Sequence, residues 1–173
     1  LIRSLKKNGT QVKTILTKSA TEFVTKLSVS SLSQEKVYTD LFDHELESEM
    51  SHIKLSRWAD LILICPATAN TISKLSKGKA DDLASTVVIA SNKQIFIVPA
   101  MNVRMWEHAS NKENVLKLKQ YGYKFIGPEI GDMACGEYGE GKMVDPYNII
   151  LFLEKYFLNQ SSNKKFKALV TAG

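Results

Sequence analysis

The chain has 173 residues, a hydrophobic fraction of 44% and a formal net charge of +5 at pH 7, which is typical of one globular domain. It contains no apolar run long enough to span a membrane and opens with no signal peptide, so we expect a cytoplasmic protein without a membrane partner. Its basic residues are scattered and do not alternate with aromatic ones, which argues against a nucleic-acid partner. The two cysteines are far apart and make no disulfide framework, which also favours a reducing compartment.

The first part of the chain predicts a helix, a strand and a second helix. Residues 1–7 have the composition of a helix end, and 12–16 form an apolar strand. Residues 19–22 match a capping box and predict a helix through Leu27. The segment 28–51 is polar and poorly periodic, and it contains an acidic run: Asp43, Glu45, Glu47 and Glu49. Because nothing fixes the mutual geometry of these carboxylates, the run favours a solvated loop over a metal site.

Two apolar strands are expected at 59–65 and 95–98, and a Pro-Ala pair follows each of them. Proline cannot donate to a strand ladder and holds the residue before it in an extended conformation, so each strand stops there. Continuous apolar strands are typical of a parallel sheet that is covered on both faces. Ligands of open α/β sheets bind at the carboxyl ends of the strands, so the polar turns after these two strands are expected to border one cleft.

Polar residues in these turns are the first candidates for a site. Thr68 and Asn70, together with the backbone N–H groups of the helix start that follows, can hold a phosphate or the polar edge of a ring. Met101 and Asn102 follow the second strand, and Asn102 either takes part in chemistry or only caps the next helix. His52 precedes a short amphipathic turn, where a histidine is usually a surface or capping residue, although it is the side chain best suited to proton transfer.

Helix and strand patterns continue to alternate along the rest of the chain. We expect helices at 83–90, 111–121 and 146–157, strands at 123–126 and 166–171, and a linker at 159–165. The alternation predicts an α/β fold with a doubly wound, mostly parallel sheet and helices on both faces. Because a helix opens the chain, the first strand of such a sheet is expected to be missing.

The segment 131–143 contains four glycines, which disfavour both helix and strand and predict a mobile loop. Cys135 lies within it, although free cysteines are mostly buried. A lid that places a thiol over the cleft has this composition, and so has a plain surface loop.

Four motifs carry a resemblance to a known family. They are His52-Ile53-x-Leu55 with Trp58-Ala59-Asp60, Pro66-Ala67-Thr68-Ala69-Asn70-Thr71, Pro99-Ala100-Met101-Asn102-x-x-Met105-Trp106, and Ala134-Cys135-Gly136-x-x-Gly139-x-Gly141-Lys142-Met143. On these motifs the chain resembles the flavin-containing cysteine decarboxylases, and among them most of all the phosphopantothenoylcysteine decarboxylases of coenzyme A biosynthesis. That family begins with a strand and a phosphate-binding loop. The resemblance therefore implies an N-terminally incomplete, Rossmann-like decarboxylase domain at 1–158, a linker at 159–165 and the first strand of a truncated synthetase domain at 166–173.

The resemblance also implies a reaction, a cofactor and roles for individual residues. FMN would take two electrons from the cysteinyl unit of 4′-phosphopantothenoylcysteine, the carboxylate would leave, and the returned electrons would give 4′-phosphopantetheine. His52 would be the base near the thiol, Asn102 would hold the carboxylate, and Cys135 would deliver a proton. The implied flavin contacts are Ser19, Thr68, Asn70 and Met101, and the implied substrate contacts are Asn102, Ala134, Lys142 and Met143, with no metal.

The family closes its site between subunits, so the resemblance implies a homotrimer or an assembly of trimers. Two alternatives remain. One is another enzyme of this fold. Cys135 disfavours a peptide-cysteine decarboxylase, and Asn102 together with Cys135 disfavours a flavin prenyltransferase. The other is a truncated, catalytically impaired relic or a flavin-binding regulatory subunit, which the missing first strand favours.

Overall fold

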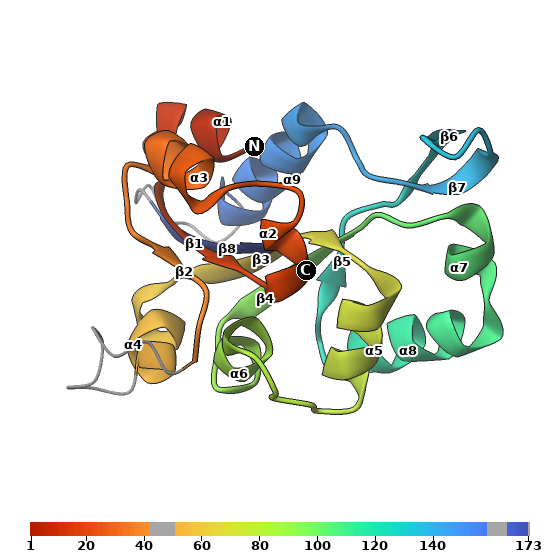
Figure 1. Ribbon diagram of the computed structural model, residues 1–173, viewed down its shortest axis with the longest axis horizontal. Helices are drawn as coiled ribbons and strands as arrows, with labels where there is room; N and C mark the ends of the chain where they lie inside the picture. Colours follow the sequence, from red (N-terminus) through yellow and green to blue (C-terminus); the bar gives the residue numbers. More distant parts are fainter. Residues whose placement is uncertain (42–50, 159–165, 173) are drawn as a thin grey trace.

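The computed structural model describes residues 1–41, 51–158 and 166–172 (Figure 1). They form a six-stranded sheet in the order β2-β1-β8-β3-β4-β5, and a separate antiparallel hairpin of β6 and β7. All pairs in the large sheet are parallel. Its strands are β1 (Gln11–Leu16), β2 (Val37–Tyr38), β3 (Leu61–Ala67), β4 (Gln94–Pro99), β5 (Lys124–Phe125) and β8 (Lys167–Ala172), and those of the hairpin are β6 (Glu129–Asp132) and β7 (Tyr138–Lys142).

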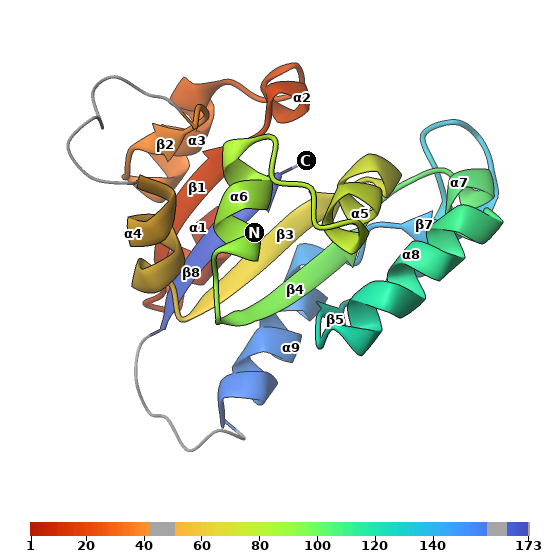
Figure 2. The same ribbon diagram turned by 90° about the horizontal axis from the view of Figure 1, so that it is seen from below.

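Helices cover both faces of the sheet (Figures 1 and 2). On one face lie α1 (Ile2–Lys7), α3 (Lys26–Ser33) and α9 (Pro146–Leu158), and on the other lie α4 (Ser51–Trp58), α5 (Ala69–Ser76), α6 (Leu83–Ile89) and α8 (Ala109–Gln120). Two short helices, α2 (Lys18–Thr21) and α7 (Val103–Glu107), follow the carboxyl ends of β1 and β4. This is the predicted doubly wound arrangement. None of the described helices is long and apolar enough to cross a membrane.

The strand β3 shows how the apolar pattern produces a two-sided core. Leu61, Ile62, Leu63 and Ile64 are at most 1% exposed. Leu61 and Leu63 belong to the core that contains residues of α1 and α9, whereas Ile62 and Ile64 belong to the core on the opposite face. Burying each such side chain contributes on the order of 1.5–3 kcal/mol, so a central strand of this composition is strongly held between two helical layers.

The two Pro-Ala pairs lie side by side, as predicted. Ala67 of β3 is in register with Pro99 of β4, and the backbone N–H of Ala100 donates to the carbonyl of Ala67 at 3.0 Å. The polar turns that follow the two strands therefore start from neighbouring points on one edge of the sheet.

The strand β8 lies in the middle of the sheet, paired with β1 on one side and with β3 on the other. Ala168 and Leu169 are fully buried, and Val170 is 4% exposed. The sequence predicts this strand, and the family resemblance implies that it opens a second domain. Within the described residues it belongs to the same sheet as the rest of the chain, because its apolar side chains and its ladder groups are satisfied there.

One local prediction in the first part of the chain is wrong. The helix predicted through Leu27 is divided into α2 and α3, each capped by its own threonine: Thr17 Oγ1 accepts from the N–H of Ala20 at 3.2 Å, and Thr25 Oγ1 from that of Ser28 at 3.1 Å. The polar and poorly periodic segment 28–51, for which the sequence predicts no helix or strand, contains most of α3 and the strand β2. The acidic run lies in 42–50, outside the described residues.

The glycine-rich segment 131–143 is not an irregular loop but contains most of the hairpin β6-β7. Gly131 is in register with Gly139, so two residues without side chains face each other across the pair. Pairing between the strands outweighs the low strand propensity of glycine here.

Candidate functional site

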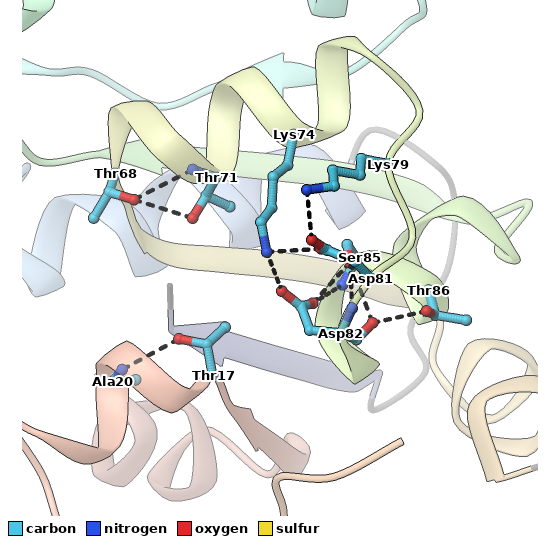
Figure 3. Close-up of polar contacts among 10 residues, drawn as sticks. All are labelled: Thr17, Ala20, Thr68, Thr71, Lys74, Lys79, Asp81, Asp82, Ser85 and Thr86. Carbon is cyan, nitrogen blue, oxygen red and sulfur yellow. Dashed lines mark hydrogen bonds and ion pairs between the residues drawn. The ribbon is translucent and has the colours of Figure 1, made fainter. Parts of the chain in front are cut away.

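A cavity of about 410 Å³ opens at the carboxyl end of the sheet, between α2, α5 and α6 (Figure 3). Its volume lies in the range of roughly 300–1,000 Å³ that is usual for small-molecule sites. The polar residues of its lining include Thr17, Ser19, Thr68, Asn70, Lys74 and Thr171. Three of the four predicted flavin contacts, Ser19, Thr68 and Asn70, therefore line one cavity.

Thr171 of β8 contributes a buried hydroxyl to this cavity. Its side chain is 2% exposed, and its Oγ1 has no hydrogen-bond partner among the described residues. A buried hydroxyl without a partner costs about 1–3 kcal/mol, so such groups usually mark a place where a ligand or water binds. Thr14 of β1 also has a buried, unpartnered hydroxyl, but it does not line the cavity.

The wall between α5 and α6 is held by charged residues (Figure 3). Lys74 Nζ lies 2.7 Å from a carboxylate oxygen of Asp81 and 2.7 Å from one of Asp82. Asp82 also caps α6, because its Oδ1 accepts from the N–H of Ser85 at 2.8 Å. A second lysine, Lys79, lies 2.8 Å from Asp81. These contacts connect the two helices that border the cavity.

The ion pairs shift the pKa values of the groups in this wall. Hydrogen bonds to Asp81 and Asp82 raise the pKa of Lys74. Hydrogen bonds from Lys74 and then Lys79 lower the pKa of Asp81 to about 2. Burial raises the pKa of Asp82, but its bonds with Lys74 and Ser85 outweigh burial, and the net shift is downward. All three groups are therefore charged at neutral pH.

A second group of polar side chains lies where β4 ends. Asn102 caps α7, since its Oδ1 accepts from the N–H of Arg104 at 2.7 Å. Its Nδ2 points the other way, to the hairpin, where it donates to Glu137 Oε2 and lies 3.5 Å from Cys135 Sγ. The prediction that Asn102 caps the next helix is confirmed, and the other end of its amide faces a thiol and a carboxylate.

The hairpin is packed directly on the turn that carries Asn102. The N–H of Met101 donates to the carbonyl of Gly141 at 3.0 Å. A Cβ at Gly141 would lie 2.4 Å from the carbonyl oxygen of Met101, and one at Gly139 would lie 3.0 Å from the side chain of Val103. The glycines therefore allow the close approach that brings Cys135 to Asn102.

The other predicted contacts are spread over the molecule. Met101 is half-buried, outside the cavity lining, and its Sδ lies 3.6 Å from Asn111. Ala134 is exposed in the hairpin turn, and the exposed Lys142 lies across Gly131. Met143 packs into the core on the α9 face of the sheet, on the opposite side from the cavity.

His52 lies far from Asn102 within one chain. It is half-buried in the first turn of α4. Figures 1 and 2 both show α4 and α7 at opposite ends of the molecule, because α4 lies beside β1 and β2 whereas α7 follows β4. The structure of one chain therefore does not bring the predicted base together with the predicted proton donor.

Sequence reasoning missed three residues of these sites. Glu137 occupies a variable position of the glycine-rich motif, but an acidic residue two positions after the only cysteine of that segment was a visible signal. Lys74 lies one turn into α5, with two aspartates shortly after it. Thr171 gave no local signal, because its role depends on where β8 lies in the sheet.

The model of the Flavoprotein family matches residues 1–158. The coenzyme A biosynthesis bifunctional protein CoaBC of Bacillus subtilis (strain 168) is 44% identical over 162 residues, which cover 94% of this chain and 40% of that protein. The protein of the same name from Borreliella burgdorferi is 41% identical over 172 residues, covering 99% and 44%. The chain thus spans less than half the length of these curated relatives.

Two solved structures share the fold. A PPC decarboxylase mutant complexed with pantothenoylaminoethenethiol is 30% identical with a TM-score of 0.81, and the match covers 91% of this chain and 88% of that one. The FMN binding protein AtHal3 is 32% identical with a TM-score of 0.80, covering 93% and 89%.

Proposed function

Because this chain belongs to the Flavoprotein family, we propose that it binds FMN and decarboxylates 4′-phosphopantothenoylcysteine to 4′-phosphopantetheine in coenzyme A biosynthesis. The observation that carries the proposal is the adjacency of two sites. The cavity lies at the end of β3, and the pair of Asn102 and Cys135 lies at the end of β4, its neighbour in the sheet. A cofactor in the first site would reach a substrate in the second.

The cavity suits the polar and anionic groups of FMN. The start of α5 offers backbone N–H groups, and Ser19 and Asn70 offer side-chain donors. The unpartnered hydroxyl of Thr171 would gain a partner there. Lys74 places a positive charge in the wall, where it forms ion pairs with both Asp81 and Asp82.

In the proposed reaction FMN supplies the two-electron chemistry, and the chain supplies positioning and proton transfer. The Nδ2 of Asn102 would hold the carboxylate of the substrate. Because Oδ1 accepts from the N–H of Arg104, the other end of the amide is the NH₂ group, which is a donor. Cys135, exposed on the hairpin, would give its thiol proton to the product carbon. His52 would take the proton of the substrate thiol.

We also propose a homotrimer, or a larger assembly of trimers, in the cytoplasm. The distance between α4 and α7 within one chain supports it, because His52 of one subunit would then complete the site of a neighbour. Mixing His52→Asn chains with Asn102→Asp chains tests this: hybrids with proven subunit exchange are expected to regain activity, and no recovery would contradict the shared site.

The test of the FMN site is a titration followed by quenching of flavin fluorescence, with Thr171→Val compared with Thr14→Val. Both changes remove a buried, unpartnered hydroxyl without changing side-chain size, but only Thr171 lines the cavity. We expect Thr171→Val to weaken FMN binding about tenfold, the equivalent of one hydrogen bond, and Thr14→Val to leave it unchanged. Equal effects of the two variants would place FMN elsewhere.

The test of the reaction is a single turnover of the FMN-loaded chain with 4′-phosphopantothenoylcysteine. The unchanged chain is expected to release carbon dioxide and form 4′-phosphopantetheine. Cys135→Ser is expected to release carbon dioxide but not to form product, because a serine hydroxyl is a far weaker acid than a thiol. FMN binding without any carbon dioxide release would instead favour a regulatory flavoprotein.

A further inference from the structure

Only one end of the Asn102 amide is used by the helix cap. Its Oδ1 is used as the cap of α7, at 2.7 Å from the N–H of Arg104. Exchange of the two ends would place an NH₂ group against that N–H, so the orientation is fixed by the helix start. The Nδ2 group therefore remains a donor, and it is directed to the hairpin.

A carboxylate of the chain itself occupies this donor. Glu137 Oε2 accepts a hydrogen bond from Asn102 Nδ2, and Cys135 Sγ lies 3.5 Å from the same nitrogen. Cys135 Sγ is also 3.8 Å from Glu137 Oε2, so the three groups form one cluster. The proposed function assigns this same donor to the carboxylate of the substrate.

We propose that Glu137 occupies the carboxylate position at Asn102 in the free chain and competes with the substrate carboxylate for it. This inference rests on the proposed function for the identity of the substrate. A ligand with a carboxylate displaces Glu137 and gains the donor, whereas a ligand without one leaves Glu137 in place. Once the substrate has lost its carboxylate as carbon dioxide, Glu137 returns to Asn102 and favours release of the product.

The backbone around Glu137 allows this exchange without opening the hairpin. The turn is closed by bonds from the N–H of Met133 to the carbonyl of Glu137 and from the N–H of Gly136 to the carbonyl of Met133, both at 2.9 Å. Glu137 is half-buried, and both Cys135 and Gly136 beside it are exposed. Rotation of one side chain is therefore enough to free Asn102.

The test compares two probes that differ only in a carboxylate, N-acetyl-L-cysteine and N-acetylcysteamine, by calorimetric titration of the FMN-loaded chain. Glu137→Ala is expected to tighten binding of N-acetyl-L-cysteine about tenfold, the size of one charge-assisted hydrogen bond, and to leave N-acetylcysteamine unchanged. The control is Glu140→Ala, which removes an exposed charge from the same hairpin and is expected to change neither probe.

Equal gains for both probes, or an equal gain from Glu140→Ala, would show a general effect of charge or access and overturn the proposal. A second measurement, by NMR spectroscopy, does not depend on probe binding. The side-chain amide resonance of Asn102 is expected to shift in Glu137→Ala and to keep its chemical shift in Glu140→Ala. No shift would refute the contact itself.

In turnover, Glu137→Ala is expected to lower KM and to slow product release. Because the probe and resonance measurements need no turnover, they separate failure of this inference from failure of the proposed reaction.

Discussion

Replacing Asp82 by alanine is expected to destabilise the chain by about 2 kcal/mol. Its Oδ1 accepts from the N–H of Ser85 at 2.8 Å, and its own N–H donates to Ser85 Oγ at 3.3 Å, which completes a capping box. Loss of such a cap costs about 1–1.5 kcal/mol. The ion pair of Lys74 and Asp82, whose side chains are 23% and 30% exposed respectively, adds about 0.5–1 kcal/mol. The helix affected is α6, whose residue Val87 is fully buried in the core.

The measurement is urea denaturation followed by circular dichroism, with the Tm as a second readout. A loss of about 2 kcal/mol lowers the Tm of a chain of this size by about 4–8 °C. Asp82→Asn is the matched control, because asparagine keeps a capping oxygen but loses the charge, so only the smaller ion-pair contribution should disappear. If Asp82→Asn and Asp82→Ala destabilise the chain equally, the cap is not the source of the effect.

The pH dependence of stability gives an independent check. The pKa of Asp82 is lowered in the folded chain, so its charge adds stability that is fully present above the unfolded pKa of about 3.9. This contribution is lost as the pH falls through the folded pKa. The unchanged chain should therefore lose more stability than Asp82→Asn as the pH falls below about 4.

Two further predictions concern the hairpin and the cysteines. Gly141→Ala should displace the hairpin from Met101, because its Cβ would lie 2.4 Å from the carbonyl oxygen there, and proteolysis at the hairpin should accelerate. Gly136→Ala has the strain of a positive φ but no neighbour within 4 Å, so proteolysis as fast as in Gly141→Ala would contradict this reasoning. Burial raises the pKa of the Cys65 thiol to about 12, so at pH 8.5 iodoacetamide should modify the exposed Cys135 alone, and mass spectrometry should find one adduct. Two adducts on the folded chain would show that Cys65 is accessible.

Features with a local cause could be predicted from the sequence. The strands β3 and β4 were recognisable because each is a short apolar run stopped by proline, and their neighbouring ends followed from parallel pairing. The helix expected at 83–90 is found as α6, whose capping residue Asp82 acts within three residues of the helix start. Thr68 and Asn70 could be assigned to a cavity because they directly follow a strand end, where ligands of open α/β sheets bind.

Features that depend on partners distant in the sequence were decided only by the tertiary structure. Residues 166–171 read as a strand, but their place between β1 and β3, which brings Thr171 to the cavity, depends on two strands distant along the chain. The glycines of 131–143 read as a loop, because nothing local shows that β6 and β7 pair with each other. The contact of Glu137 with Asn102 spans 35 positions. Cross-strand pairing and side-chain contacts at such separations depend on how the whole sheet is assembled, and local propensity carries no information about them.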